Sequence, residues 1–379
     1  MEKYTLLPID DYHMWILELF FNVALGIPLS VLGVVVNILN LLVLSQHNLK
    51  ETTNIMLLSL SSLDLFYSFT SIFFHVASLI ELIDPYFAKT YLTFIELVLR
   101  MPNSMSFIIT IFLVTAIGIE RAIAVLFPFH VSRIFTPYRA KWMLLGLYLF
   151  GSVPICPYYY SLRYRWEFIP TVSKTVAVLT ATDFYINNFQ VITDYVNYFV
   201  NNTTTTVPIV LIFISSTLII FQLNRIKTNE LSNKTSRLKK EIKVVKMLLV
   251  VCLVSFMVLV PVHVLHSYLA YYLKELSNNF YRLVSLLAPA MYQVNASVNF
   301  FIYITMSSKF AETYKSLVYW PPSKDFQCSL SCRGIGRQLK IFRVLFPAGV
   351  LAANQKSESC VLCHLINLTH GFSLKIVSM

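Results

Sequence analysis

Seven apolar runs, each near the length of a membrane-spanning helix, dominate this chain. A helix needs about 20 apolar residues to cross the hydrocarbon core of a bilayer. Of the 379 residues, 56% are hydrophobic and only 13% are charged, a balance far too apolar for a soluble domain of this size. The predicted spans are residues 16–45, 54–80, 91–123, 140–160, 195–223, 243–271 and 282–305. The chain is therefore expected to be an all-α membrane protein, a seven-transmembrane helix bundle.

These spans divide the chain into four predicted parts. They are an extracellular N-terminal tail (1–15), the seven-helix transmembrane domain (16–305), a short cytoplasmic amphipathic helix (306–318) and a cytoplasmic tail (319–379). The first run is too long for a cleaved signal peptide and continues through Asn37 and Asn40, so it is expected to be a true span. The tail mixes basic stretches with short apolar fragments, and we expect it to be largely disordered or adsorbed to the membrane.

Basic residues predict the orientation of the bundle. Most of the 30 Lys and Arg residues lie on one side of the predicted topology, in segments 121–141 and 224–246 and after residue 305. Because cytoplasmic loops carry the excess of Lys and Arg, the N-terminus is predicted to be extracellular and the C-terminus cytoplasmic, in a multi-pass protein of the plasma membrane. The net charge of +11 then indicates contact with anionic membrane lipid and a cytoplasmic partner, and not with nucleic acid.

None of the six cysteines lies in a clearly extracellular loop, so no extracellular disulfide is predicted. Cys360 and Cys363, followed by His364, have the spacing of metal ligands, but nothing completes a ligand set. Cys328 and Cys332 follow a basic amphipathic stretch and are candidates for S-acylation, with unmodified thiols as the alternative.

Polar residues recur inside the spans at helical spacing. Asp64 lies about ten residues into the second span, where a carboxylate needs partners or water. Thr110 of the third span and Asn295 and Asn299 of the seventh are expected to converge on it in a hydrated polar core that can hold a sodium ion, the one cofactor considered. The alternative is that these side chains only join the helices by hydrogen bonds.

Several motifs occur in a fixed order at matching depths. They are Gly33 with Asn37, Leu60 to Asp64, Glu120-Arg121-Ala122, Pro128, Pro208, Pro261, and Asn295 to Tyr303, followed by Phe310. On these residues, the chain from about 16 to 318 resembles a rhodopsin-class G-protein-coupled receptor. The run from Glu120 to Lys141 looks most like invertebrate chemosensory and neuropeptide receptors. The resemblance implies an extracellular ligand and coupling to a heterotrimeric G protein.

The resemblance also implies a switch at the cytoplasmic end. Glu241, at the start of the sixth span, matches the acidic partner that such receptors place opposite Arg121. Arg121 is expected to pair with Glu120 and Glu241 in the inactive state and to be freed when the sixth helix swings about Pro261, while Tyr303 retains its part in the switch. The alternative is that Glu241 is one acid among solvated lysines.

Three departures from the family pattern stand out. Both cysteines of the extracellular disulfide are missing, and Glu96 stands where the first is expected at the top of the third span. The tryptophan motif before Pro261 is absent. Phe300 replaces the proline of the seventh span, which restores a backbone donor and should straighten that helix.

The sequence argues against two classes of ligand, retinal and cationic amines. The seventh span has no lysine to carry retinal, and Asn103 stands where amine receptors have an aspartate. The resemblance implies that the ligand is a peptide or a small chemosensory molecule, beneath a second extracellular loop of about 161–193. The predicted ligand-binding residues are Arg100, Asn103, Ser104, Asn201, Thr204, His263, His266, Tyr292 and Gln293.

Two of these assignments have alternatives. Asn201 and Thr204 are placed at a pocket-facing upper turn of the fifth span, which is otherwise too short to cross; a glycosylated loop is the other interpretation. His263 and His266 suit a polar or amide-bearing ligand or a water-satisfied pair.

Other classes of membrane protein fit less well. A transporter would show paired halves, and no internal repeat relates the first three spans to the last three. A channel or an intramembrane enzyme would need a selectivity loop or a catalytic dyad, and neither pattern is seen, so the protein is not expected to be an enzyme. A polytopic transporter, or another seven-helix protein without G-protein coupling, is kept as the alternative.

Overall fold

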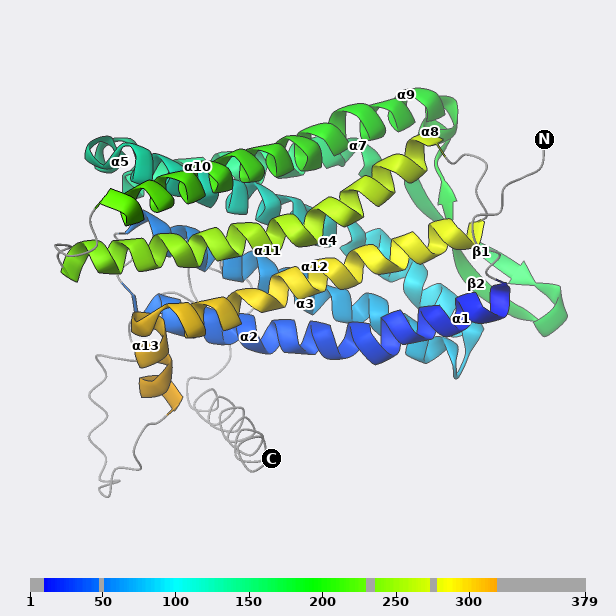
Figure 1. Ribbon diagram of the computed structural model, residues 1–379. Coiled ribbons are helices and arrows are strands. Elements are labelled where there is room, and N and C mark those ends of the chain that lie inside the picture. The colour runs from blue at the N-terminus through cyan, green and yellow to red at the C-terminus, as the bar shows by residue number, and fades with distance from the viewer. Residues whose placement is uncertain (1–9, 48–50, 230–235, 273–277, 319–379) are drawn as a thin grey trace, which may run out of the picture. The chain divides into compact units, whose positions relative to one another are not determined.

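Long helices run side by side in the computed structural model, which describes residues 10–47, 51–229, 236–272 and 278–318 (Figure 1). The first crossing joins α1 (Asp11–Leu19), a π-helix η1 (Phe20–Gly26) and α2 (Ile27–Ser45). Next come α3 (Thr52–Glu81), α4 (Pro85–Leu126), the short α5 (Pro128–Ile134) and α6 (Pro137–Ser152), which continues through η2 (Val153–Ile155) into α7 (Cys156–Tyr159).

The second half of the chain completes the bundle. Two short helices, α8 (Asp183–Asn187) and α9 (Phe189–Asp194), precede the π-helical turns η4 (Tyr195–Val200) and η5 (Asn202–Thr206) and then α10 (Val207–Asn229). The last helices are α11 (Ser236–Tyr272), α12 (Asn278–Met306) and α13 (Ser308–Val318). The predicted seven-helix bundle is therefore confirmed as the fold, with α13 following it at the predicted amphipathic segment.

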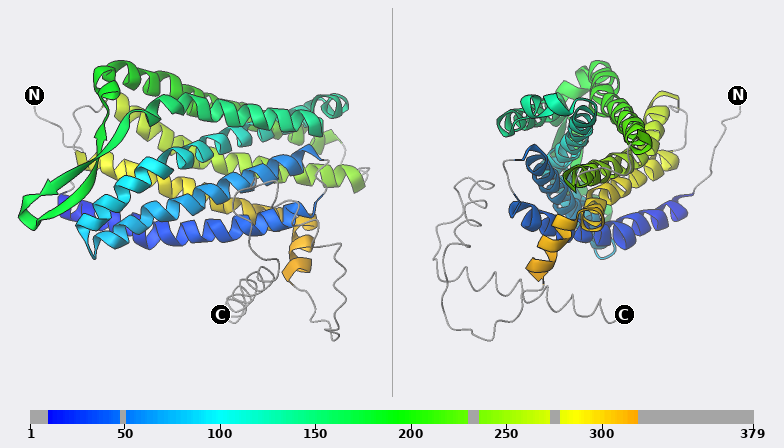
Figure 2. Two further views of the ribbon diagram at one scale, coloured as in Figure 1. Left: turned by 180° about the vertical axis from the view of Figure 1, so that it is seen from behind. Right: turned by 60° about the vertical axis from the view of Figure 1, so that its left-hand side comes forward.

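Two features mark the ends of the bundle. An antiparallel hairpin of β1 (Leu162–Ile169) and β2 (Lys174–Ala181), joined by the turn η3 (Pro170–Val172), lies at one end, and α13 lies at the other (Figures 1 and 2). We call these the hairpin end and the α13 end. The hairpin was not predicted from the sequence.

Capping residues explain where several helices begin. The Asp10 side chain accepts a hydrogen bond from the backbone of His13, so the first helix starts at Asp11 and not at the expected residue 16. Asp84 caps α4 in the same way and is followed by Pro85, whose fixed φ suits a first helical turn. Thr136 and Pro137 repeat this arrangement at α6.

Within the described residues, five helical segments are long and apolar enough to cross a membrane: 11–45, 52–81, 85–126, 189–225 and 242–265. The fourth and seventh predicted spans are not among them. The fourth is broken near Pro154 into α6, η2 and α7, and the seventh, α12, carries Gln293, Asn295 and Asn299. Both nevertheless pack within the bundle, α6 against α4 and α12 against α2, α3 and α11.

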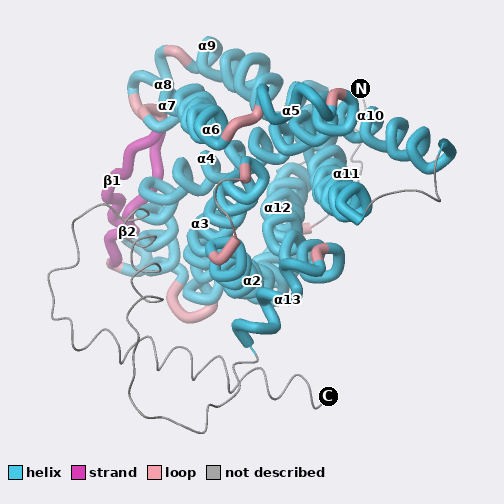
Figure 3. Tube along the Cα trace, turned by 90° about the vertical axis from the view of Figure 1, so that its left-hand side faces the viewer, coloured by secondary structure: helices cyan, strands magenta, loops and turns pink. Residues whose placement is uncertain are grey.

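Helix α4 is the centre of the packing. It contacts α3, α6, α10 and α11 as well as strand β2, and it contributes Ile109, Leu113, Val114 and Ile117 to the main hydrophobic core. Seen along the helices from the α13 end, α12 lies between α11 and α2 (Figure 3). Polar residues on α4 and α12 are therefore positioned to meet at helix interfaces.

A close contact joins the π-helical turn η1 to α3. His75 is buried, and its Nδ1 lies 3.2 Å from Asn22 Oδ1. A Cβ at Gly26 would lie 2.6 Å from the His75 ring and 2.8 Å from the Phe21 carbonyl oxygen. Glycine at position 26 therefore allows the imidazole to fit against the first helix.

Gly26→Ala is expected to lower the thermal stability of the purified protein, because an added methyl group must displace both a ring and a backbone carbonyl. Overpacking of this kind costs about 1–3 kcal/mol, more than the roughly 1 kcal/mol that alanine gains over glycine in a helix. Gly146→Ala is the matched control, since a Cβ there meets nothing within 4 Å. Melting of both variants in one detergent tests this, and equal melting temperatures would contradict it.

Candidate functional site

Polar side chains follow α4 along its length and meet partners from α3 and α12. From the hairpin end to the α13 end, those that bond to another helix or form an ion pair are Asn103, Thr110 and the pair Glu120 and Arg121. Each of these layers joins α4 to α3, and the layer of Thr110 also involves α12 through Asp64.

The middle layer is centred on Asp64 of α3, which is 1% exposed. Asn299 of α12 donates a hydrogen bond from Nδ2 to Asp64 Oδ2 at 2.9 Å, and the Thr110 hydroxyl of α4 donates to Oδ1 at 3.3 Å. The carboxylate thus receives two neutral donors from two other helices. We name Asp64, Thr110 and Asn299 the polar core.

Asn295 lies in the adjoining layer and takes a different partner. Its Oδ1 accepts a hydrogen bond from the Ser255 hydroxyl of α11 at 2.9 Å, which joins α12 to α11. Asn295 was predicted to converge on Asp64, and its contact with Ser255 was not predicted. Ser255 lies six residues before Pro261 in an otherwise apolar run, and that isolated hydroxyl was the available signal.

A charged layer lies near the α13 end. Arg121 donates to both carboxylate oxygens of Glu120, from Nη2 to Oε1 at 2.7 Å and from Nε to Oε2 at 3.2 Å. A second bond from Nη2 reaches the Thr53 hydroxyl in the first turn of α3. The side chains of Arg121 and Glu120 are 15% and 3% exposed. The side chain of the predicted partner Glu241 lies outside the described residues, so that pairing stays a prediction.

Thr53 was not predicted as a partner of Arg121. It begins the polar stretch that opens the second span, and its place at the same end as Arg121 was the only signal. The contact ties the arginine to a neighbouring helix, so any outward movement of the guanidinium must break it.

Phe300 stands at the position where the family that the sequence resembles has a proline, and its side chain contacts α13. Its ring lies 6.0 Å from Phe310 and 5.6 Å from Tyr314, and α12 is helical throughout this region. Tyr303 also packs against Phe310 at 5.7 Å. Its hydroxyl is buried and has no hydrogen-bond partner among the described residues. These contacts link the end of the seventh span to the amphipathic helix.

Closer to the hairpin end, Asn103 turns toward α3. Its Nδ2 donates to Thr70 Oγ1 at 2.8 Å and also reaches Ser71 Oγ and the Tyr67 carbonyl oxygen, both at 3.2 Å. Asn103 was predicted to contact ligand, but its amide nitrogen is committed to helix contacts, since a polar group at this depth must find partners within the bundle.

Three aromatic rings lie between this layer and the polar core. Phe107 of α4 stacks on Tyr292 of α12 at 3.7 Å and contacts Tyr67 of α3 at 6.0 Å. Tyr292 is the one predicted ligand residue in this group. We call Tyr67, Phe107 and Tyr292 the aromatic layer.

Two other predicted ligand residues are used within the bundle. Gln293 is 1% exposed, and its Nε2 donates to Ser68 Oγ at 2.7 Å and to the Leu29 carbonyl oxygen at 3.2 Å. Thr204 is buried and donates to the carbonyl oxygen of Val200 in its own helix. The Gln293 amide nitrogen thus joins helices, and the Thr204 hydroxyl bonds to nearby backbone, while Gln293 Oε1 has no hydrogen-bond partner among the described residues.

The remaining predicted ligand residues are spread over three helices. Arg100 of α4 is half-exposed, pairs with Glu96 one turn earlier and lies over the Phe74 ring at 5.6 Å. His263 of α11 has Nε2 2.9 Å from the Thr206 hydroxyl of η5. Ser104 and Asn201 are half-buried, and Asn201 is a helical residue between η4 and η5 and not part of a loop. The side chain of His266 lies outside the described residues, as do Cys328 and Cys332.

The bond between Thr206 and His263 was also missed. Thr206 donates to Asn202 Oδ1 at 3.1 Å, so its hydroxyl oxygen is the acceptor for His263 Nε2–H. The contact joins η5 to α11 two residues from Pro261, and π-helical turns recur at functional sites. The run of threonines in the sequence was the signal.

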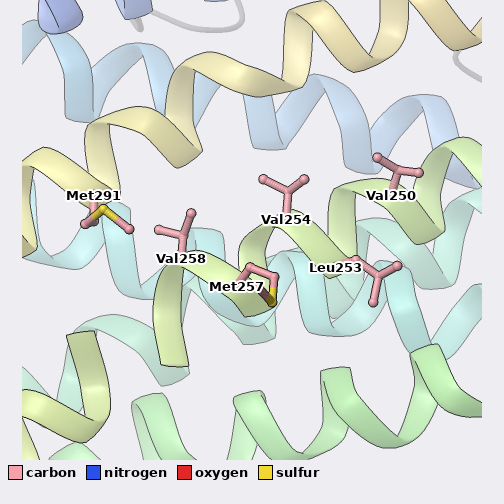
Figure 4. A pocket seen from close by; sticks show the side chains of 6 residues that line it. All are labelled: Val250, Leu253, Val254, Met257, Val258 and Met291. Carbon is pink, nitrogen blue, oxygen red and sulfur yellow. The ribbon is translucent and has the colours of Figure 1, made fainter. Parts of the chain in front are cut away.

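An apolar pocket of about 360 Å³ lies between α11 and α12. Its lining consists of Val250, Leu253, Val254, Met257 and Val258 from α11 and Met291 from α12 (Figure 4). None of the predicted ligand residues contributes to it. Met257 is 70% exposed, so the pocket opens on the outer flank of the bundle.

The hairpin is held against α4 without a disulfide. The free edge of β2 is paired at Ala177, whose amide donates to Thr90 Oγ1 at 3.2 Å and whose carbonyl accepts from Thr93 Oγ1 at 3.0 Å. Lys174 adds an ion pair of 2.8 Å with Asp84. The hydrogen bond from Lys174 lowers the pKa of the Asp84 carboxyl below its ordinary value, so the pair persists at neutral pH.

The comparisons agree with this architecture. The family model described as 7 transmembrane receptor (rhodopsin family) matches residues 36–303. An FMRFamide receptor of Drosophila melanogaster is 25% identical over 361 residues, which cover 87% of this chain and 60% of the relative. The chain thus spans about three-fifths of the length of that relative. By the extent of the family match, the chain belongs to the rhodopsin family of seven-transmembrane receptors.

Proposed function

We propose that this protein is a G-protein-coupled receptor for an extracellular neuropeptide. The observation that carries the proposal is the series of polar layers between α3, α4 and α12, which ends at Arg121, within a chain that matches the rhodopsin family over residues 36–303. The similarity to an FMRFamide receptor favours a peptide over a small chemosensory molecule. A transporter is disfavoured by the same family match.

The receptor is proposed to lie in the plasma membrane with the hairpin end outside. Support comes from the basic segments 121–141 and 224–246, whose described parts (121–141, 224–229 and 236–246) lie toward the α13 end (Figure 1). In that orientation the aromatic layer and His263 lie toward the extracellular side of the bundle, and Arg121 lies toward a cytoplasmic G protein. Basic residues at the α13 end also suit contact with anionic lipid.

Arg121 is the proposed switch. Its paired hydrogen bonds to Glu120 are charge-assisted, and bonds of this kind contribute about 1.5–3 kcal/mol. The Thr53 contact anchors the same guanidinium to α3. Since about 1.4 kcal/mol shifts a two-state population tenfold, these contacts are strong enough to favour the resting arrangement. An agonist that binds the rearranged bundle more tightly releases Arg121 through movement of α11.

Sodium binding in the polar core is proposed as a property of the resting receptor. Asp64 offers a carboxylate that neutral donors alone surround, and Thr110 adds a hydroxyl oxygen. Hard cations prefer such oxygen ligands. Asn295 is a less direct candidate, because its Oδ1 accepts from Ser255.

Cells that express the receptor are expected to respond to FMRFamide with G-protein nucleotide exchange, measured by GTP analogue binding in their membranes. Arg121→Ala should abolish this response while surface expression and peptide binding persist, because Arg121 is the group presented to the G protein. The free-acid form of the peptide and a panel of small odorants serve as ligand controls. A response only to an odorant, or full signalling by Arg121→Ala at matched surface level, would overturn the proposal.

Loss of either the Glu241 contact or the Thr53 contact of Arg121 should raise G-protein nucleotide exchange in the absence of agonist. Glu241→Ala tests the predicted partner on α11, and Thr53→Val tests the observed contact; each is expected to raise basal exchange by up to about tenfold, as for a loss of about 1.4 kcal/mol. Ser62→Ala is the matched control, since that hydroxyl donates to the Leu58 carbonyl of its own helix. Unchanged basal exchange in both test variants would refute a restraining role for these contacts.

Asp64→Asn should remove the sodium dependence of agonist affinity. Asparagine keeps the size and hydrogen-bonding capacity of the side chain but lacks the charge that a cation needs, so the fold should be retained. Ser255→Ala, which affects only the neighbouring bond to Asn295, should leave the sodium response in place. Peptide binding in sodium and in N-methylglucamine buffers measures the difference, and an undiminished sodium effect in Asp64→Asn would exclude a cation at this site.

A further inference from the structure

Strand β1 carries a row of exposed aromatic side chains. Tyr164, Trp166 and Phe168 occupy alternate positions and therefore share one face of the strand. They are 46%, 54% and 58% exposed. Exposed aromatic groups that lie together, and not singly, mark a surface that another phase or molecule covers. These three side chains take no part in the proposed switch at Arg121.

This row is continuous with an apolar stripe on α4. The Phe94 ring of α4 lies 5.5 Å from Tyr164 and 6.2 Å from Trp166. Phe87 and Val98, seven residues before and four residues after Phe94, lie on the same side of the helix and are both more than half exposed. Exposed apolar side chains on a membrane-spanning helix face lipid, so the lipid-facing surface of α4 extends onto β1.

The position of these rings along α4 corresponds to the membrane boundary. Phe94 lies three residues inside the predicted start of the third span, which at 1.5 Å per residue is about 5 Å from that boundary. Figure 2 shows the hairpin at the end of the bundle, where β2 packs on α4. Tyr and Trp are enriched at this depth because their rings are apolar and their polar atoms remain hydrated.

Charged residues occupy the opposite face of β1. Arg163, Arg165 and Glu167 alternate with the aromatic row, and Arg163 pairs with Asp183 at 3.2 Å. The strand is thus amphipathic, with one face suited to lipid and the other to water. The Thr90 and Thr93 contacts fix which edge of the hairpin meets α4 and so prevent it from turning over.

We propose that the aromatic face of β1, formed by Tyr164, Trp166 and Phe168 with Phe94, inserts into the phospholipid headgroup region beside α4. The hairpin is then held between α4 and the bilayer and does not move freely in water. This contact supplies a restraint in a chain whose hairpin and α4 contain no cysteine. The inference does not depend on the ligand or on G-protein coupling.

Fluorescence of the full chain in lipid vesicles tests the proposal. Replacing Trp15, Trp142 and Trp320 by Phe leaves Trp166 as the single emitter. In vesicles of phosphatidylcholine brominated near the top of the acyl chains, Trp166 should lose most of its emission relative to unbrominated vesicles, whereas aqueous acrylamide should quench it weakly. Emission that is equal in both kinds of vesicle would overturn the proposal.

Two variants in the same single-tryptophan background test whether quenching by brominated lipid is confined to the aromatic face of β1. Arg165→Trp combined with Trp166→Phe places the emitter on the charged face, where bromolipid should have little effect and acrylamide a strong one. Phe168→Trp combined with Trp166→Phe returns it to the aromatic face and should restore bromolipid quenching. Equal bromolipid quenching on both faces would refute the assigned orientation of the hairpin. Folding of each variant is checked by its melting temperature.

Discussion

Polar groups within the hydrocarbon must find their partners inside the bundle, and the helix interfaces of this protein are arranged around that requirement. Asp64 is the most demanding case, since a carboxylate at this depth is costly unless other helices supply donors. Asn299 and Thr110 do so from α12 and α4. Asn37 acts similarly by donating to the Gly33 and Ala296 carbonyl oxygens, both at 2.9 Å, which ties the first helix to α12. The polar residues therefore specify which helices are neighbours.

The same requirement explains which parts of the site the sequence could predict. Apolar length indicated seven helices, and isolated polar residues indicated layers at given depths. Periodicity gives the face of a helix but not which of two neighbouring helices a side chain turns to. Asn103 and Gln293 were therefore assigned to a ligand cavity, whereas both turn to helix contacts. Thr53 was missed because the contact with Arg121 depends on the relative placement of two helix ends.

The position of the hairpin could not be predicted from the sequence for a different reason. Alternation along Leu162–Ile169 is typical of a strand, but a long loop between two membrane spans gives no independent sign of what it packs on. The absence of the two cysteines could be read from the sequence. The bonds by which Thr90 and Thr93 hold the hairpin could not, because hydrogen bonds from a hydroxyl group to the backbone have no sequence signature. Several such bonds and an ion pair restrain the hairpin reversibly, whereas a disulfide would restrain it covalently.

Phe300 changes how movement at the end of α12 must be transmitted. With proline absent, the helix has no missing backbone donor at this point and thus no built-in hinge. Phe300 and Tyr303 both contact Phe310 of α13, so Tyr303 cannot move without disturbing this aromatic cluster. Movement of Tyr303 is therefore coupled to the position of α13, through side-chain packing in place of a kink in the backbone.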